Sequence, residues 1–256
     1  MELSFDEFYS FTSKITKEAS EIITSHNHSG IEASRKLDGT IVTDTDLRIE
    51  RLLRARIDEK FPLHSIVGEE YPDKKKTSLY TWVIDPIDGT TSYQFGVPFY
   101  GTLIGLLKNE KPQFGSMRLP MFDQMLAGDG SQCLINGNKT QVKKFDGFEN
   151  SLVLTSDEMR MNDSVYNKSW NHLRKTDATF RTWGDCYGYF LVCTGKADAM
   201  FDLSLKPCDI LPIIPIVEGA GAKVIDFGNP PYCDISVCIP ELEEKIQKLF
   251  IMLLNL

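Results

Sequence analysis

The segment Asp85-Pro86-Ile87-Asp88-Gly89-Thr90 constrains this chain more than any other part of it. The apolar run 80–84 is typical of a buried strand and leads directly into Asp85. A proline and a glycine inside the segment predict a sharp turn that places Asp88 beside Asp85. Two carboxylates held this close repel each other unless a cation neutralises them. Hard divalent cations such as Mg²⁺ take oxygen ligands and often bind together with phosphate. The segment therefore predicts metal-assisted phosphoryl chemistry.

Two further acidic sites support this interpretation. The strand-like run 65–68 leads into Glu69-Glu70, and Asp209 lies far downstream before an apolar stretch. An Asp-x-x-Asp pair alone is common in acidic turns, whereas the complete segment 85–90 is far more specific. The backbone N–H groups of Thr90-Thr91, at the expected start of a helix, would suit a phosphate. We therefore favour a metal and phosphate site over an acidic surface turn.

The composition is that of an acidic globular protein. With 256 residues, of which 42% are hydrophobic, the chain can bury a large core. Its formal net charge of −8 disfavours nucleic acid and anionic membranes as partners. No apolar run reaches the ~20 residues of a membrane-spanning helix, and the apolar end 250–254 is expected to pack on the core. No targeting signal is visible and the six cysteines form no Cys-x-x-Cys pair, so we expect reduced thiols in a cytoplasmic protein.

The first half of the chain reads as helices over a largely antiparallel sheet. Apolar residues at helical spacing predict a helix from Ser4 to about Ser25, with Ser4 and Glu7 at the spacing of a capping box. Residues 26–30 are expected to break this helix, and residues 35–45 to form a polar mobile loop. A second helix is expected over 47–61, ended by Pro62. Strand patterns follow at 65–68, 80–84, 99–107, 113–118 and 126–140.

The second half predicts alternating strands and helices. We expect strands at 151–155, 197–201 and 223–226, and helices at 159–174 and 184–194. A further apolar helix should begin at Asp209, end near residue 221 and be kinked by Pro215. The whole chain is predicted to be one layered α/β (α+β) unit of residues 1–256. Its sublayers are expected at about 1–145, which carries the metal site, and 146–256, which supplies Asp209 and substrate contacts.

The acidic motifs together resemble those of the inositol monophosphatase-like family of Mg²⁺-dependent phosphatases. The matching pieces are Val42-Thr43-Asp44-Thr45-Asp46, Gly68-Glu69-Glu70, the segment 85–90, and Asp209 before a helix that ends Glu218-Gly219-Ala220-Gly221. The resemblance runs from the N-terminal helix to about residue 228. It implies an α/β/α/β/α sandwich that assembles as a homodimer and hydrolyses a small phosphate ester.

The resemblance also implies roles for individual residues. Two to three Mg²⁺ ions would be bound by Glu69, Asp85, the carbonyl of Ile87, Asp88 and Asp209. Thr90, oriented by Asp46, would help to deprotonate the water that attacks phosphorus in line. The substrate would contact Asp88, Gly89, Thr90, Gly184, Asp185, Asp202 and Asp209.

Two of the candidate residues have simpler interpretations. Asp46 lies near the start of a predicted helix, where an acid often serves as an N-terminal cap; the resemblance favours catalysis. Lys36 lies where the family often has a basic residue near the metals, and an exposed loop charge explains it equally well.

The segment Trp183-Gly184-Asp185-Cys186-Tyr187-Gly188-Tyr189 bears on the substrate. It resembles the histidinol-phosphatase-like branch, in which an acid would pair with the amine of L-histidinol phosphate. A carboxylate beyond the metals favours a cation there and disfavours a second anion. Asp202 would add a second acid on the leaving-group side. These residues predict hydrolysis of L-histidinol phosphate to L-histidinol, a step of histidine biosynthesis.

Two departures keep other substrates and functions open. Cys208 stands where the family usually has tryptophan, and Thr91-Ser92 is closer to the inositol branch. An inositol-1-phosphate phosphatase or a broad sugar-phosphate phosphatase is the alternative within the same class. A catalytically silent member that binds metal or a partner is the alternative from another class, although no metal ligand is missing.

Overall fold

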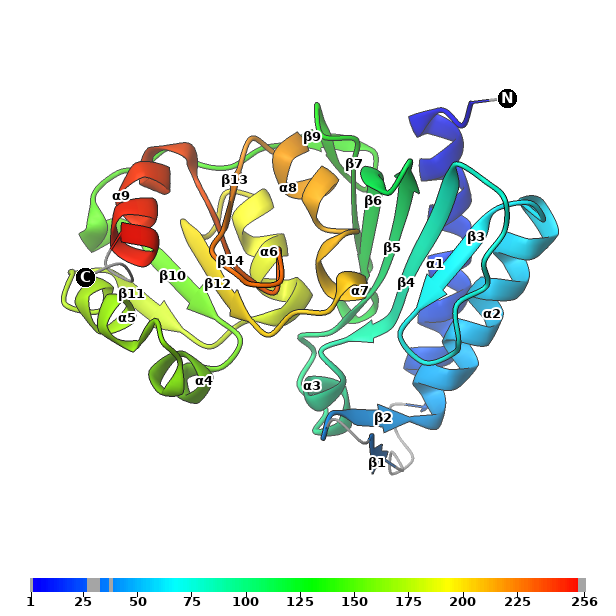
Figure 1. Cartoon of the computed structure of the whole chain (residues 1–256), viewed down its shortest axis with the longest axis horizontal. Coiled ribbons are helices and arrows are strands. Elements are labelled where there is room, and N and C mark those ends of the chain that lie inside the picture. Colours follow the sequence, from blue (N-terminus) through cyan, green and yellow to red (C-terminus); the bar gives the residue numbers. More distant parts are fainter. Residues whose placement is uncertain (1, 27–32, 37–38, 253–256) are drawn as a thin grey trace.

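Layers of helix and sheet alternate across the molecule (Figure 1). A computed structural model describes residues 2–26, 33–36 and 39–252. Helices α1 (Phe5–His26) and α2 (Asp44–Lys60) cover the outer face of a seven-stranded sheet. Helices α6 (Asp185–Cys193), α7 (Pro207–Ile210) and α8 (Ile214–Gly219) lie between this sheet and a five-stranded one. The outer face of the second sheet is covered by α4 (Glu158–Asp163), α5 (Asn167–Leu173) and α9 (Glu243–Gln247). The predicted layered α/β fold is confirmed.

The seven-stranded sheet is largely antiparallel, as predicted. Its order is β3-β4-β5-β6-β7-β8-β9, and only the pair β3 and β4 is parallel. Asn109 and Glu110 join β5 to β6 with positive φ angles of 50° and 64°, and Asn136 and Gly137 join β8 to β9 with φ of 47° and 83°. Both are tight hairpin turns. The strands are β3 (Ser65–Gly68), β4 (Tyr80–Asp88), β5 (Gly101–Lys108), β6 (Lys111–Leu119), β7 (Gln124–Gly128), β8 (Cys133–Ile135) and β9 (Asn138–Thr140).

The five-stranded sheet is mixed, in the order β11-β10-β12-β14-β13. Strand β10 is parallel to both of its neighbours, so the carboxyl ends of β10 and β12 lie at the same edge. Strands β11 and β14 were not predicted, because β11 has three residues and β14 follows a proline-rich turn. The strands are β10 (Leu152–Thr155), β11 (Thr179–Arg181), β12 (Ala199–Leu203), β13 (Lys223–Asp226) and β14 (Asp234–Cys238).

Both N-terminal helices begin with capping boxes. The Ser4 N–H and hydroxyl donate to Glu7, and the Glu7 N–H donates back to Ser4 Oγ, as predicted. Helix α2 begins at Asp44 rather than residue 47, because Thr43 and Asp46 form the same reciprocal arrangement. The N-cap is therefore Thr43, and Asp46 is its partner.

The prediction of a continuous loop over residues 35–45 is wrong at both ends, although the described residues 36, 39 and 40 lie in no helix or strand. Residues Ala33–Arg35 (β1) pair antiparallel with Ile41–Thr43 (β2), and α2 starts at the next residue. The β-branched run at 41–43 is short and has polar neighbours, which hid its strand character. The break expected over residues 26–30 lies largely outside the described residues.

Two predicted helices are each divided into two. The stretch from Asp209 to residue 221 forms α7 and α8, separated around Pro212. Pro215 lies in the first turn of α8, where its missing N–H costs nothing, so it does not kink a helix. The predicted helix 159–174 is likewise α4 followed by α5, with turn residues between them.

Buried side chains fill each space between layers. One cluster joins α1 and α2 to the first sheet, a second lies between the sheets around α6 and α8, and a third lies under α5 and α9. The third cluster includes Phe250, so the chain end packs on the core as far as it is described; residues 253–254 lie outside that part. None of the helices described is both long enough and apolar enough to cross a membrane.

Candidate active site

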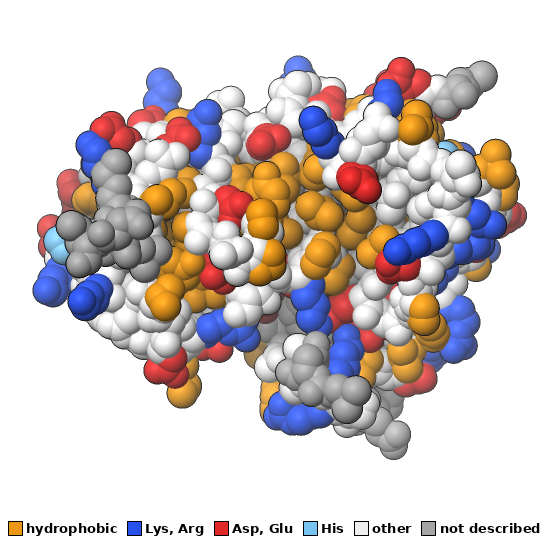
Figure 2. Space-filling view, in the orientation of Figure 1, with side chains coloured by type: hydrophobic (Ala, Val, Ile, Leu, Met, Phe, Trp, Pro, Cys, Tyr) orange, Lys and Arg blue, Asp and Glu red, His pale blue; other side chains and the backbone are white. Residues whose placement is uncertain are grey.

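One cavity of about 670 Å³ collects the candidate residues from both sheets. Figure 2 shows a hollow below the centre of the molecule, with basic and acidic side chains beside it. The cavity lies where β3 and β4 end, where α3 (Thr90–Gln94) and α6 begin, and where β12 leads into α7. Its walls include every predicted metal ligand and substrate contact: Glu69, Asp85, Ile87, Asp88, Gly89, Thr90, Gly184, Asp185, Asp202 and Asp209.

The acidic turn is built differently from the prediction. Strand β4 does not end at Asp85 but continues through the proline to Asp88, with its pairing to β5 shifted between these two acids. The turn comes at Gly89, which has a φ of 85° and caps α3. A Cβ at this position would lie 2.7 Å from the carbonyl oxygen of Phe99. Gly89 therefore serves both the left-handed backbone and the close approach of the next strand.

Asp85 is the most deeply buried of the acids predicted to bind metal. Its side chain is 1% exposed, and Oδ1 has no hydrogen-bond partner. Burial raises the pKa of Asp85, and the nearby carboxylates of Glu69 and Asp88 raise it further. Burial also raises the pKa of Asp88 and of Asp209. The acids gathered here are therefore poorly compensated by the protein itself.

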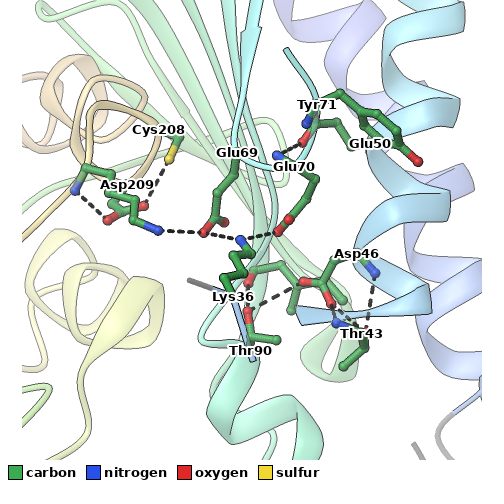
Figure 3. Close-up of polar contacts among 12 residues, drawn as sticks. Lys36, Thr43, Asp46, Glu50, Glu69, Glu70, Tyr71, Thr90, Cys208 and Asp209 are labelled. Atoms are coloured by element: carbon green, nitrogen blue, oxygen red, sulfur yellow. Dashed lines mark hydrogen bonds and ion pairs between the residues drawn. The ribbon is translucent and has the colours of Figure 1, made fainter. Parts of the chain in front are cut away.

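Two lysines engage Glu69 beside this cluster (Figure 3). Lys36 Nζ lies 2.9 Å from Glu69 Oε1 and 2.7 Å from Glu70 Oε1, and the lysine side chain is 19% exposed. Lys206 Nζ lies 3.4 Å from the same oxygen of Glu69. Lys36 is therefore not an exposed loop charge. Burial opposes its ionisation, but the hydrogen bonds to the two glutamates raise its pKa above the ordinary value.

The donor atoms at the acidic cluster are of the type that a hard divalent cation binds. A buried carboxylate oxygen without a partner, such as Asp85 Oδ1, is costly unless an ion or another donor pairs with it. Glu69, Asp88 and Asp209 all act on Asp85 and offer only oxygen, the ligand atom that Mg²⁺ prefers. In the described part of the chain, no three His, Cys, Asp or Glu side chains converge closely enough to hold an ion. Glu69 is paired with Lys36 and Lys206 in this arrangement.

Asp46 and Thr90 meet at the edge of the cavity. The Thr90 hydroxyl donates to the carbonyl of Ile87 at 3.0 Å and lies 3.5 Å from Asp46 Oδ1. The other oxygen of Asp46 accepts the N–H and the hydroxyl of Thr43. Burial raises the pKa of Asp46 to about 6 despite these bonds. One acid thus serves the capping box and contacts the candidate catalytic hydroxyl.

The leaving-group side of the cavity is also acidic. Asp185 begins α6 with a positive φ of 50°, a strained backbone for a non-glycine residue. A Cβ on Gly89 would lie 3.2 Å from Asp185 Oδ2, so the carboxylate faces the turn. Burial raises the pKa of Asp185 to about 6 and that of Asp202 to about 7. Asp202 accepts hydrogen bonds from Ser156 at 3.0 Å and from Tyr189 at 3.2 Å.

Sequence reasoning missed several residues of the cavity wall. Ser156 and Asp157 follow β10, Arg160 lies in α4, and Lys206 precedes α7. Ser156 directly follows β10, and Asp202 lies near the end of β12. These two strands are parallel, so their carboxyl ends lie at one edge of the sheet. Ser156 could have been found from the sequence, because it is a polar residue directly after the predicted strand 151–155. Arg160 gave no such signal, because a charged residue within a predicted helix is usually solvated.

The comparisons with known proteins agree with this geometry. A model of the inositol monophosphatase family matches residues 4–251. The chain belongs to the inositol monophosphatase family. It is 35% identical over 198 residues to the histidinol-phosphatase of Chlorobaculum parvum, covering 77% of this chain and 76% of that protein. It is 31% identical over 202 residues to inositol monophosphatase 1 of Mus musculus, covering 75% and 73%.

Solved structures confirm the family fold. Extragenic suppressor protein suhB from Bartonella henselae superposes with a TM-score of 0.88, at 19% identity, over 95% of this chain and 98% of that one. An inositol monophosphatase from Thermotoga maritima gives 0.86 at 21% identity, covering 97% and 98%. As a member of this phosphatase family, the chain is a phosphoric monoester hydrolase.

Proposed function

We propose that this phosphatase hydrolyses a small phosphate ester with Mg²⁺ as its cofactor. The observation that carries the proposal is the buried, unpartnered Oδ1 of Asp85 among acids that offer only oxygen donors. Glu69, Asp85, Asp88, Asp209 and the carbonyl of Ile87 would hold the cations. When bound, Mg²⁺ supplies a more acidic water and stabilises negative charge on the phosphate and the leaving oxygen.

The chain's own groups would position and deprotonate the attacking water. Thr90 Oγ1 is held by the carbonyl of Ile87 and lies near Asp46, so the hydroxyl can pass a proton toward that carboxylate. A pKa of about 6 lets Asp46 act as a base near neutral pH. Two cysteines lie beside the acids, Cys186 at Asp88 and Cys208 at Asp209; both are buried, and burial raises the pKa of each thiol. A thiol in that state is a poor nucleophile, which favours direct attack by water.

The substrate proposed is L-histidinol phosphate. Asp157, Asp185 and Asp202 line the cavity beyond the acidic turn, and Arg160 lies among them. An excess of carboxylates on this side favours a leaving group that carries a cationic amine. This substrate would place the enzyme in histidine biosynthesis. The similarity to a histidinol-phosphatase supports the same choice.

Inositol-1-phosphate is the second candidate. Thr91 and Ser92 line the cavity next to Thr90 and resemble the inositol branch of the family. Lys206 and Arg160 also reach the cavity, so a neutral polyol would find both donors and acceptors there. A sugar phosphate of broad type falls into the same class.

The deciding experiment compares kcat/KM with Mg²⁺ for the two substrates side by side. A preference of about a hundredfold for L-histidinol phosphate, ~2.7 kcal/mol of transition-state binding, is expected. Equal kcat/KM values, or a higher value for inositol-1-phosphate, would assign the enzyme to the inositol or broad-specificity class instead. Absence of Mg²⁺-dependent phosphate release from any ester would instead point to a silent, metal-binding family member.

We also propose a homodimer. Phe95, Val97 and Phe122 are 73%, 40% and 38% exposed, and Phe122 stacks on Tyr187, which stacks on Phe99. Exposed apolar side chains of this kind are typical of an interface, and we propose a second copy of the chain as the occupant. Sedimentation should give a dimer that the double change Phe95→Asp, Phe122→Asp converts to a monomer. A wild-type monomer would refute this assignment.

The proposed compartment is the cytoplasm. All six cysteines are free, as expected for a protein kept in a reducing environment.

A further inference from the structure

One polar stripe of helix α2 faces the chain that follows β3. The stripe consists of residues spaced at i, i+3, i+4, i+7 and i+11, which places them on one side of a helix. Each of them contacts the segment 70–74 through its side chain, except Leu47, which accepts through its carbonyl oxygen. Its members are Leu47, Glu50, Arg51, Arg54 and Asp58.

Glu50 is the centre of this stripe and is fully buried. Its Oε2 accepts the backbone N–H of Glu70 at 2.7 Å. Its Oε1 accepts the N–H of Tyr71 at 3.2 Å and the Nε of Arg54 at 2.7 Å. Every partner of the carboxylate is therefore a donor, and two of the three belong to the turn that carries Glu69 and Glu70 (Figure 3).

Arg54 donates hydrogen bonds to the carbonyl groups of the same turn. Its Nη2 donates to the carbonyl of Tyr71 at 2.9 Å, and Nη1 donates to that of Pro72 at 3.2 Å. The turn is thus held through its N–H groups by Glu50 and through its C=O groups by Arg54. At Gly68 the fit is so close that a Cβ would lie 2.1 Å from Glu50 Oε1.

A purely structural role does not account for this arrangement. Replacing a buried ion pair by apolar residues is often neutral or stabilising, so the pair is not needed to hold α2 against the sheet. Ile49, Leu53 and Ile57 already bury the adjacent face of the helix. What apolar side chains cannot do is accept two adjacent backbone N–H groups and so fix the direction of Glu69 and Glu70.

We propose that Glu50 is a positioning residue for the metal site and acts through the Glu69-Glu70 turn. The inference rests on the proposed metal chemistry. Asp46 lies one helical turn before Glu50 on α2, so one rigid helix would set both the acid beside Thr90 and the acids beside Lys36. Without the hydrogen bonds to Glu50, the chain would stay folded, but Glu69 would no longer have a fixed orientation in the cavity.

The test compares Glu50→Gln with wild type by Mn²⁺ binding in electron paramagnetic resonance and by hydrogen exchange in chelator. A glutamine turns its NH₂ toward a donor in either orientation, so the turn must loosen. We expect the Kd for Mn²⁺ to rise at least ~10-fold, the range seen when outer partners of metal ligands are removed. Amide exchange over residues 68–72 should accelerate, and the Mg²⁺ concentration for half activation should rise while KM for substrate at saturating Mg²⁺ stays constant.

Two controls separate positioning from general destabilisation. Glu18→Gln makes the same chemical change at the partner of Arg56 and leaves the turn untouched. Ile57→Ala destabilises α2 from its apolar face. Both should keep the wild-type Kd for Mn²⁺, even where the thermal midpoint falls. If Glu50→Gln does not fold, Glu50→Asp keeps the charge, shortens the reach and carries the same expectation.

The outcomes distinguish this inference from the proposed function. A wild type that binds Mn²⁺, together with a folded Glu50 variant that binds it equally well, overturns the positioning role alone. Equal loss of affinity in Ile57→Ala also overturns it, because destabilisation would then be the cause. A wild type that binds no Mn²⁺ overturns the proposed metal chemistry and the positioning role together.

Discussion

Asp88 connects the two halves of the cavity at the level of a single side chain. It ends β4, and its Oδ2 accepts the backbone N–H of Cys186 at the start of α6. Burial raises its pKa, and Asp185 and Asp209 add to the effect. The residue therefore lies where negative charge needs a counter-charge, which is the property expected of a metal ligand.

Changing Asp88 to Asn should abolish turnover without unfolding the chain. The amide keeps an acceptor for the Cys186 N–H but removes a charge that the proposed cations need. We expect kcat to fall by about 10³-fold, or on the order of 4 kcal/mol. In chelator, the thermal midpoint should be equal or higher, because one of several repelling acids is gone. Near-wild-type turnover by a folded variant would refute the metal assignment.

Changing Asp185 to Asn should affect substrates unequally. The amide keeps the shape but cannot attract an ammonium group, so KM for L-histidinol phosphate should rise about 10-fold, or ~1.4 kcal/mol. KM for inositol-1-phosphate should change little, since that leaving group is neutral. Initial-rate measurements on both esters make the comparison. Equal increases would mean that Asp185 shapes the cavity rather than binding an amine.

At the residue scale, the sequence identified the acids but not their surroundings. The segment 85–90 and Glu69-Glu70 carry their chemistry in the residue types themselves, so they could be read directly. Lys206 and Arg160 are ordinary charges in the sequence, and only the fold brings them to the cavity. The contacts of Glu50 could not be predicted from the sequence either, because a glutamate in a helix is usually solvated.

At the element scale, the capping box at the start of α2 also orients Asp46, one of the two candidate catalytic residues. Thr43 caps the helix, and its N–H and hydroxyl both donate to the oxygen of Asp46 that does not face Thr90. The same contact stabilises the helix and fixes the orientation of the carboxylate. A change at Thr43 should therefore show in stability and in catalysis together.

Thr43→Ala should lower the free energy of unfolding by about 1 kcal/mol, the usual effect of losing an N-cap side chain. It should also lower kcat, since Asp46 is then free to rotate away from Thr90. Thr43→Ser keeps the hydroxyl and is the matched control, with values near wild type for both. Urea titration and steady-state kinetics supply the two readouts. A drop in stability with unchanged kcat would limit Thr43 to capping.

Element types were easier to predict than element boundaries. Apolar strand patterns at 99–107 and 113–118 located β5 and β6, whereas β1, β2 and β11 are only three residues long and gave little periodicity. The split of α7 from α8 was missed because the apolar residues around Pro212 continue the helical pattern across the break. Their burial between the two sheets, not their backbone, produced that pattern.

At the scale of the whole molecule, the crowding of acids links stability to pH. Burial raises the pKa of Asp46 and Asp185 to about 6 and of Asp202 to about 7, all above their values in an unfolded chain. The protonated forms are thus favoured by folding. This contribution is complete below pH ~4 and is lost as the pH rises through 6 and 7.

In chelator, the free energy of unfolding should therefore fall between pH 5 and pH 8. Each such carboxyl contributes a slope of up to ~1.4 kcal/mol per pH unit. Urea titrations across this range give the slope directly, and Asp202→Asn should make it shallower. Adding Mg²⁺ should restore stability at pH 8, because binding to the folded state alone stabilises it. Stability that rises with pH in chelator would contradict the raised pKa values.

The overall architecture came from the resemblance more than from local patterns. Alternating strands and helices indicated layers, but nothing in their spacing said that β4 and β12 end at one cavity. That meeting depends on the packing of α6 and α8 between the sheets. The predicted sublayers of residues 1–145 and 146–256 remain a prediction.

The walls of the cavity come from both sheets. Enzyme activity therefore also reports whether the two sheets have come together. Asp85 and Asp88 lie on one sheet, Asp202 on the other, and Asp209 in the layer between them. A chain with either sheet formed alone has an incomplete set of acids. Recovery of turnover after denaturation is therefore an assay of assembly: it should follow the joining of the two sheets, and lag behind any signal that reports only on strands and helices.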